Sequence, residues 1–317
     1  MAKKQLPLFS SQPTTAEEIS KQTPVGATLD LFRKYLTHEG KSEHTVKAFI
    51  GDMELLCEYT GEQTPIGQYK TSTLNDYLDW MENRRGVSCS RKTYARRVTT
   101  LKVYFKWLKQ VDAIPHDPAL AILQRSGPAP LSHVLSPQQV DAVLAVASQQ
   151  KRGDEQDYRP EFLFRLLLLT GIKKSEAGRL MLNDFDTDNA QYPSVLIRHR
   201  TRNVYKERRI DVPPELVDLL RDYQEEYQLK DEVFTCTTRN LEYILTDLGK
   251  DAGVPFKLSF EVMRWTMGVR DWRSGGDENA IREKMGLSQA SWYETSNKIK
   301  RLIARQIASE AHAPIDD

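Results

Sequence analysis

Apolar residues recur at helical spacing through the first third of the chain. Four segments place large apolar side chains three or four residues apart, with charged side chains on the opposite face. These segments begin near Thr28, Ser42, Thr73 and Ser90, and glycines or polar loops separate them. Four amphipathic helices of this length predict a small helical bundle.

A nearly unbroken apolar run marks the second part of the chain. It extends from Phe162 to Leu169, is polar only at Arg165, and is too short to span a membrane. The run predicts a helix buried inside a domain, with Gly171 as its left-handed end. A second helix is predicted to follow at once, capped by Ser175 and with Glu176 in its first turn, where the helix dipole favours a carboxylate.

The remaining pattern predicts further helices and one pair of strands. Residues 192–197 are apolar and β-branched, and residues 208–212 alternate between polar and apolar side chains. Helices are predicted to start near Ser136 and Pro213, and a last amphipathic helix contains Ile299 to Ile307. The chain is therefore expected to be mainly α-helical, with a small antiparallel sheet.

Composition along the chain indicates four parts. Residues 1–24 are rich in Gln, Ser, Thr and Pro and predict a flexible arm. Residues 25–112 hold the four amphipathic helices. Residues 113–134 contain several prolines and predict a semi-rigid linker, and residues 135–317 form the second domain.

Charge is balanced overall but unevenly distributed. The chain has 45 Lys and Arg against 44 Asp and Glu, a formal net charge of +1. Residues 84–111 contain nine basic residues and no acidic one. Charge runs on helices are usually solvated faces, but a run without counter-charges in an otherwise balanced chain favours contact with nucleic-acid phosphates. The candidate DNA-binding residues are Arg84, Arg85, Arg91, Lys92, Arg96, Arg97 and Lys102, and Lys106 and Lys109 complete the run.

The cysteines and the N-terminus bear on the cellular compartment. Cys57, Cys89 and Cys236 are widely spaced, so they predict neither a metal site nor a disulfide framework, but reduced thiols. The N-terminus has no apolar segment typical of a signal peptide. We therefore expect a cytoplasmic protein without a metal, a cofactor or a membrane partner.

Three stretches resemble signatures of the tyrosine recombinase (phage integrase) family, in its Xer-like, two-domain form. Residues 168–177 read Leu-Leu-Thr-Gly-Ile-Lys-Lys-Ser-Glu-Ala, against Leu-Leu-Thr-Gly-Leu-Arg-apolar-Ser-Glu-Leu in the family. Residues 42–53 are similar to its Ser-x-x-Thr-x-x-x-Tyr-x-x-Asp-Leu pattern, and residues 103–108 to its Phe-Tyr-x-Trp-Leu pattern. The resemblance implies an N-terminal four-helix, SAM-like core-binding bundle and an α+β tyrosine-recombinase catalytic-type domain with a small antiparallel sheet.

The resemblance also implies a catalytic set, which this sequence keeps only in part. Lys173 stands where the family has its first catalytic arginine, and Arg264 matches the second. Lysine cannot reproduce the bidentate contact of a guanidinium with a phosphate. Glu261 and Leu287 stand where the family has histidines that bind phosphate and transfer protons, so a carboxylate and an alkyl group replace them.

The nucleophile implied by the resemblance is out of register. The family's tyrosine would fall on Ser296, nine residues after Leu287, and the nearest tyrosine is Tyr293. A shortened loop could bring Tyr293 into place. Alternatively, Tyr293 and its neighbour Trp292 pack in the core, and this second interpretation is favoured because buried aromatic side chains are usually core residues.

The predicted hairpin carries the last of the candidate site residues. In the family, a lysine on the turn of this hairpin donates a proton to the leaving oxygen, and either Arg202 or Lys206 can occupy its position. An arginine would donate a proton poorly, because its pKa is too high. Arg198 and Arg200 are added to Arg202 as candidate DNA-binding residues of the hairpin.

Three functions are compatible with these observations. The leading hypothesis is a DNA-binding protein of the tyrosine recombinase family, from a mobile element, that has lost strand cleavage and associates with the nucleoid. The second is a divergent active recombinase that uses Tyr293. The third is a helical protein-interaction module. The expected partners are double-stranded DNA and further subunits, either copies of this chain or related recombinases, onto which the C-terminal helix would dock if it does not pack in cis.

Overall fold

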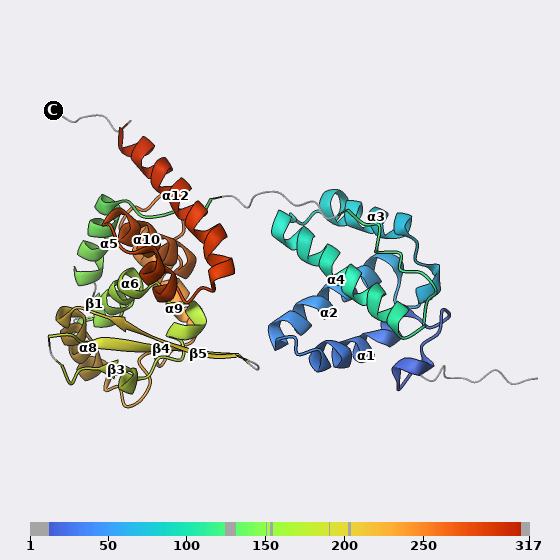
Figure 1. Ribbon diagram of the computed structural model, residues 1–317, viewed down its shortest axis with the longest axis horizontal. Coiled ribbons are helices and arrows are strands. Elements are labelled where there is room, and N and C mark those ends of the chain that lie inside the picture. Colours follow the sequence, from blue (N-terminus) through green and yellow to red (C-terminus); the bar gives the residue numbers. More distant parts are fainter. Residues whose placement is uncertain are drawn as a thin grey trace, which may run out of the picture. The chain divides into compact units, whose positions relative to one another are not determined.

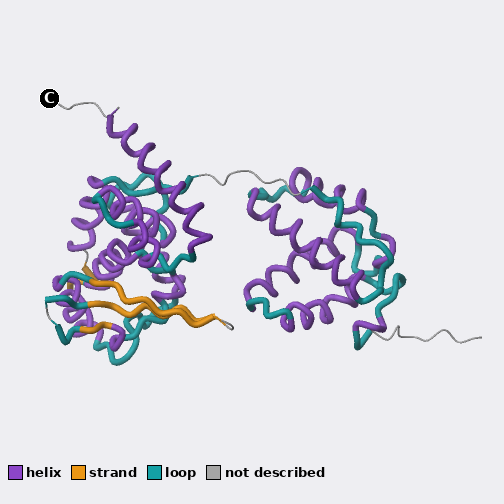
Figure 2. The backbone as a smooth tube through the Cα atoms, viewed as in Figure 1, coloured by secondary structure: helices purple, strands orange, loops and turns teal. Residues whose placement is uncertain are grey.

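The computed structural model describes residues 13–123, 131–149, 151–152, 155–189, 191–201 and 204–311. The chain divides into two compact units, residues 1–129 and 130–317. Figure 2 shows the described strands in the second unit, whereas the described elements of the first are helical. None of the helices in the described part of the chain is long and apolar enough to cross a membrane.

The N-terminal unit is the four-helix bundle that the sequence predicts (Figure 1). Ser42 and Ser90 cap the second and fourth helices, because each side chain accepts a hydrogen bond from the backbone N–H three residues later. The third helix ends at Asp79 and continues as a π-helical turn. The elements are η1 (Ala16–Glu18), α1 (Val25–His38), α2 (Glu43–Thr60), η2 (Ile66–Gln68), α3 (Thr71–Asp79), η3 (Trp80–Arg84) and α4 (Arg91–Gln110).

The core of this unit extends beyond the four helices at both ends. Ile19 is 5% exposed and packs into the bundle, although it falls in the segment assigned to the flexible arm. Ile114, Ala119 and Ile122 fall in the segment assigned to the linker, and they too are buried in this core. These apolar side chains bring parts of both flanking segments against the bundle.

The C-terminal unit is built around the buried apolar run of the sequence. The run forms α6, whose left-handed end is Gly171 with φ 57°, and α6 packs against α5, α8, α9 and α10 (Figure 1). The described helices are α5 (Pro137–Gln149), α6 (Tyr158–Thr170), α7 (Lys174–Ala177), η4 (Leu182–Asp184), α8 (Pro214–Tyr227), α9 (Thr238–Asp251), α10 (Phe260–Arg273), α11 (Glu278–Lys284) and α12 (Gln289–Ala311).

The predicted strand pair is confirmed as an antiparallel hairpin. The hairpin belongs to a three-stranded sheet in the order β3-β4-β5, formed by β3 (Phe185–Asp186), β4 (Ser194–Thr201) and β5 (Val204–Asp211). Val195 lies opposite Ile210, and both are buried in the core. A short second pair, β1 (Lys151–Arg152) with β2 (Glu155–Gln156), joins α5 to α6.

The C-terminal helix packs in cis. Ile299 and Leu302 of α12 are buried in a cluster with residues of α10, and Gln306 donates a hydrogen bond to the Leu135 carbonyl at 3.3 Å. Arg273 also pairs with Glu310 at 2.7 Å. These contacts hold α12 against its own unit.

A buried carboxylate ties two helices of the N-terminal bundle together. The Asp52 side chain on α2 is 4% exposed and accepts hydrogen bonds from Arg96 Nε at 3.0 Å and Arg96 Nη2 at 2.6 Å. It also accepts a hydrogen bond from Thr100 at 2.9 Å, and Arg97 Nε lies 3.4 Å away. The counter-charge of these two arginines therefore comes from a different helix, not from the basic run itself.

We predict that Asp52→Ala destabilises the N-terminal unit by about 3–5 kcal/mol, because it leaves the largely buried Arg97 without a carboxylate. Hydrogen exchange measured peptide by peptide separates the two units, and protection should fall in α2 and α4 while the C-terminal unit is unchanged. Asp30→Ala is the matched control, since the Asp30 side chain is 85% exposed. Equal exchange in the two variants would contradict the structural role of Asp52.

Candidate functional site

The candidate site of the C-terminal unit is organised by a buried carboxylate, that of Glu176. Its side chain is 2% exposed and accepts a hydrogen bond from the Lys173 backbone N–H at 2.8 Å. Arg208 on β5 donates two further hydrogen bonds to it, at 3.1 and 2.8 Å. Burial would raise the pKa of Glu176, but the hydrogen bonds and charge of Arg208, together with Lys173, hold this pKa below its ordinary value. The ionised carboxylate therefore links the start of α7 to the hairpin.

Glu176, and not Ser175, closes the N-terminal turn of α7. The helix begins at Lys174, so Ser175 lies inside it and the predicted serine cap is wrong. The predicted second helix is also shorter than expected, because it ends at Ala177. The carboxylate satisfies one of the free N–H groups at this helix end while it pairs with Arg208.

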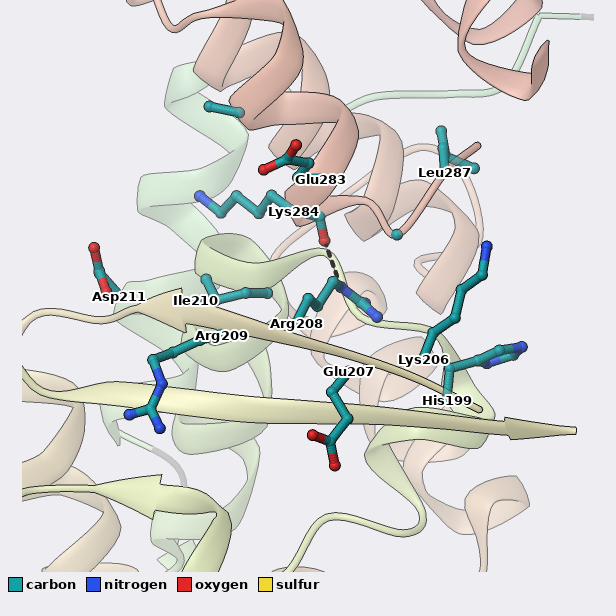
Figure 3. A pocket seen from close by; sticks show the side chains of 12 residues that line it. His199, Lys206, Glu207, Arg208, Arg209, Ile210, Asp211, Glu283, Lys284 and Leu287 are labelled. Carbon is teal, nitrogen blue, oxygen red and sulfur yellow. Dashed lines mark hydrogen bonds between the residues drawn. The ribbon is translucent and has the colours of Figure 1, made fainter. Parts of the chain in front are cut away.

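The Arg208 guanidinium is held on two sides. Its Nε donates a hydrogen bond to the Lys284 carbonyl at 2.9 Å, at the end of α11 (Figure 3). Gly286 follows with φ 61°, and a Cβ there would lie 2.9 Å from Arg208 Nη1. The turn after α11 can thus approach the guanidinium only because it carries a glycine. Arg208 fixes the geometry of the site and has few N–H groups left for a ligand.

Arg264 on α10 is anchored by two backbone carbonyls. It donates to the Gly171 carbonyl at 2.6 Å and to the Met285 carbonyl. Gly171 has φ 57°, the left-handed region that favours glycine, and a Cβ there would lie 2.2 Å from Met267 Cε, which would then have to move. Burial lowers the pKa of Arg264 to about 10, which leaves it protonated at neutral pH. A guanidinium has five N–H donors, so donors remain for an anion.

Lys173 belongs to the same site. Burial lowers the pKa of its ammonium, Glu176 opposes this effect, and the positive charges of Arg264, Arg208 and Lys206 lower the pKa further. The hydrogen bond from Arg264 to the Gly171 carbonyl holds Arg264 beside the turn that carries Lys173, so these two candidate phosphate-binding positions lie near each other. The described carboxylates form no ion pair with Lys173.

A cleft of about 600 Å³ lies between the hairpin and the end of α11, and Lys206 and Arg208 line it, whereas Lys173 and Arg264 are not among its lining residues. Lys206 and Arg208 point from β5 toward α11, while Glu207 and Arg209 point away (Figure 3). His199 lies opposite Lys206 on β4, and both line the cleft with Leu287. Leu287 packs partly against the cluster that contains Met285, so its side chain contributes an apolar wall and no hydrogen-bond donor.

The side chains of the remaining catalytic candidates differ in their exposure to solvent. Glu261 lies exposed in the first turn of α10, one turn before Arg264. Ser296, at the family's nucleophile position, is only 7% exposed, and its hydroxyl donates to the Tyr293 carbonyl. Tyr293 is 77% exposed, so the packing interpretation is wrong for this residue, whereas Trp292 is 5% exposed and does pack in the core.

The basic run of the N-terminal unit divides into two groups. Four of its arginines have counter-charges within 4 Å: Arg84 with Asp79, Arg85 with Glu58, and Arg96 and Arg97 with Asp52. The other five pair with no carboxylate in the described part of the chain: Arg91, Lys92, Lys102, Lys106 and Lys109. Only this second group carries positive charge that the fold itself does not neutralise.

The basic residues of the hairpin are also divided. Arg198 pairs with the buried carboxylate of Asp184 and lies 3.4 Å from Glu207. Arg202 and the side chain of Arg200 lie outside the described residues. Lys206 has no described ion-pair partner. The hairpin therefore offers Lys206 to a ligand most directly.

His199, Glu176 and Arg208 take part in the site but were not among the candidates from the sequence. A signal for two of them was present in the hairpin, because alternate residues of a strand share a face. Lys206 and Arg208 therefore had to lie on one side, and the residue opposite Lys206 had to join them. No local signal identifies Glu176 as the partner of Arg208, since the pair joins residues far apart in the chain.

The chain is similar in sequence to a known domain and to known proteins. A model of the phage integrase N-terminal SAM-like domain matches residues 29–111. Tyrosine recombinase XerC of Mycobacterium sp. (strain KMS) is 31% identical over 163 residues, which cover 51% of this chain and 54% of the relative. The chain thus spans about half the length of the mycobacterial relatives it matches. XerC of Listeria innocua serovar 6a is 24% identical over 275 residues, 82% of this chain and 89% of the relative.

Solved structures share the fold. XerH site-specific recombinase, in a post-cleavage complex with a palindromic difH substrate, has a TM-score of 0.69 and 16% identity, covering 92% of this chain and 97% of its own. The Tn1549 transposon integrase, in complex with a circular intermediate DNA, has a TM-score of 0.67 and 21% identity, covering 87% of this chain and 95% of its own. A lambda integrase dimer bound to a COC′ core site has a TM-score of 0.67 and 12% identity, covering 86% of this chain and 77% of its own.

We predict that Glu176→Gln destabilises the C-terminal unit by about 3 kcal/mol or more at neutral pH, because Arg208 then lacks its buried counter-charge. The pKa of Glu176 is lowered in the folded state from 4.5. Its ionisation therefore stabilises the fold above that value, and this contribution is lost as the pH falls through the folded pKa. The difference between the variant and the parent should accordingly shrink in acid.

Limited proteolysis along a urea gradient, analysed by mass spectrometry, measures the unfolding of each unit separately. Glu283→Gln is the matched control, because it removes the charge of a carboxylate that also lines the cleft but is 70% exposed. A difference between Glu176→Gln and the parent that stays constant from neutral pH into acid would contradict an ionised, buried Glu176.

Proposed function

Because the chain is related to the Xer-like tyrosine recombinases in sequence and fold, we propose that it binds double-stranded DNA through basic surfaces on both of its units and has lost strand cleavage. The unneutralised cations of α4 carry this proposal most directly, since they lie in the part matched by the integrase SAM-like domain. The origin in a mobile element and the cytoplasmic, nucleoid-associated location stay predictions from sequence.

The unneutralised cations of α4 are aligned. Lys102, Lys106 and Lys109 are spaced four and three residues apart, and Arg91 precedes Lys102 by about three helical turns. These four residues, which we call the α4 stripe, therefore face the same side of the helix. A row of cations along one helix face matches the spacing of charge along a nucleic-acid backbone better than it matches a single acidic side chain.

The second basic surface surrounds Glu176 in the C-terminal unit. Arg208 uses three of its five N–H donors on Glu176 and a backbone carbonyl, so it acts mainly as a positioning residue. Lys173, Lys206 and the remaining donors of Arg264 are available to an anion. Lys173 and Lys206 bring point charges rather than a planar fork, which suits phosphate attraction better than the bidentate contact used in a transition state.

The loss of cleavage is supported by the chemistry around this surface. Glu261 places a negative charge one helical turn from Arg264, and Leu287 offers no proton to a leaving group. Ser296, in the register of the family nucleophile, is buried and its hydroxyl bonds within its own helix. The site thus keeps cations that attract a phosphate, whereas a carboxylate and an alkyl group stand at two positions where the family has proton-transferring histidines.

One observation favours the second function, a divergent active recombinase. Tyr293 is 77% exposed on α12 and three residues from the expected register, so its hydroxyl is open to solvent and to a ligand. Its phenol would still need a base, and Glu261 and Leu287 stand at the positions where the family pattern has histidines. A protein-interaction module, the third function, would bind an acidic partner instead of DNA and would not retain nucleic acid on purification.

We predict that Lys102→Glu, Lys106→Glu and Lys109→Glu together weaken binding to duplex DNA at least about tenfold, and lower the slope of log affinity against log salt by about two to three. Each lysine that contacts a phosphate releases a counterion from the DNA, and replacing that lysine with glutamate removes this release. Fluorescence anisotropy across a salt series measures both quantities.

The matched control for this test is Lys34→Glu with Lys41→Glu and Lys70→Glu. It changes the net charge equally in the same unit, but at exposed lysines outside α4. If both triple variants lose the same affinity, the effect comes from net charge and the α4 stripe is not the DNA-binding surface.

We also predict that no covalent protein–DNA adduct forms. Each replaced group in a preorganised phosphate site costs about a hundredfold or more in rate, and the effects of such groups are not independent. A nicked suicide duplex, carrying a site that the chain itself selects from random DNA, should remain unlinked on a denaturing gel.

Tyr293→Phe tests the remaining candidate nucleophile in the same assay and should behave as the parent does. A known active tyrosine recombinase on its own nicked site shows that the assay detects an adduct. An adduct with the parent chain that disappears in Tyr293→Phe would establish the divergent recombinase in place of the proposed function.

A further inference from the structure

His199 introduces a titratable group at the edge of the basic cleft. It lies on β4 directly opposite Lys206, and its side chain is 29% exposed. Its ring lies beside the Lys206 side chain at the end of the cleft that also holds Leu287 (Figure 3). A histidine is thus present in this cleft, although it comes from a strand and not from either of the positions where the sequence resemblance expects one.

The imidazole is not needed to satisfy its nearest carboxylate. His199 Nδ1 lies 3.5 Å from Glu176 Oε1, but Arg208 and the Lys173 N–H already donate to both carboxylate oxygens. No hydrogen bond joins the His199 ring to another residue in the described part of the chain. The ring is therefore available to a ligand in the cleft.

The surroundings keep this imidazole neutral in the absence of a ligand. Burial lowers the pKa of His199 from 6.5, Lys173 lowers it further, Glu176 opposes the effect, and Arg208 and Arg179 lower it again. Lys206 faces the ring from the opposite strand. Five charged residues surround His199. Lys173 precedes α7, Glu176 lies in α7 and Arg179 lies in the turn after it, whereas Lys206 and Arg208 lie on β5.

A phosphate in the cleft would reverse this balance. Its negative charge would offset the surrounding cations and stabilise the imidazolium, which can then donate a charge-assisted hydrogen bond to a phosphate oxygen. The proton comes from solvent, and no bond other than the N–H bond is made or broken. Ligand binding and proton uptake are then thermodynamically linked, so that lower pH must tighten binding.

We propose that His199 is a DNA-phosphate ligand that binds as the imidazolium, so that the C-terminal unit takes up one proton when it binds DNA. This proposal rests on the proposed function, because the phosphate belongs to the DNA held by this cleft. His199 therefore makes the affinity for DNA sensitive to pH in the range where histidine titrates.

The test measures DNA affinity of the full chain against pH, with a labelled duplex of about 30 base pairs of mixed sequence at fixed ionic strength. Between about pH 8 and about pH 5.5, affinity of the parent chain should rise by up to about tenfold per unit in the steepest part. His199→Gln keeps a hydrogen-bonding side chain but cannot become charged, so its affinity for the duplex should not rise as the pH falls. His44→Gln, at an exposed histidine of the N-terminal unit, should behave as the parent.

A second measurement reports on His199 directly. The imidazole carbon-bound protons, assigned from the signal that His199→Gln removes, give the pKa by NMR with and without the duplex. The pKa of His199 should rise on DNA binding, an effect that a merely structural histidine would not show. Thermal unfolding of both variants checks that they are folded.

The outcomes separate this inference from the function on which it rests. If the parent binds the duplex but His199→Gln keeps the same pH dependence, or the NMR pKa of His199 does not rise, then the role of His199 is wrong and DNA binding stands. If the parent does not bind duplex DNA at any pH tested, both the proposed function and this inference are wrong.

Discussion

The ion pair between Glu176 and Arg208 is the contact on which the C-terminal site depends. A carboxylate this deeply buried is tolerated only when it is paired and its oxygens are hydrogen-bonded. Arg208 meets that requirement from the β-hairpin and, through a backbone carbonyl, also fixes the end of α11. The pair thus sets where the hairpin, α7 and the following turn meet, and the cleft is the space that this arrangement leaves open.

Once that pair is made, the cations of the site have different tasks. Arg208 and part of Arg264 are used to hold backbone elements together. Lys173 and Lys206 have no such task, and they face the same region from two different elements. A site of this kind attracts an anion and positions it, because its positive charge exceeds the single carboxylate at its centre. It supplies no neutral donor at Leu287, where the sequence resemblance would require one.

Local patterns were sufficient to predict the bundle, the buried helix and the hairpin, because periodicity and capping residues act within a few positions. They failed where the answer depends on distant neighbours. Trp292 and Tyr293 are adjacent on α12, yet one is buried and the other exposed, since α10 covers only one side of the helix. Likewise, the acid-free run of α4 does not reveal that Asp52 on α2 neutralises two of its arginines.

The two units use positive charge by the same logic. In each unit, one buried carboxylate forms an ion pair with arginine: Asp52 with Arg96 in the bundle, and Glu176 with Arg208 beside the hairpin. Arginine suits this task because its planar fork can satisfy both oxygens of a carboxylate at once. The lysines are left outside these pairs and keep their charge for a ligand. A net charge of +1 conceals two unneutralised basic surfaces, because acidic residues elsewhere in the chain balance these lysines in the total.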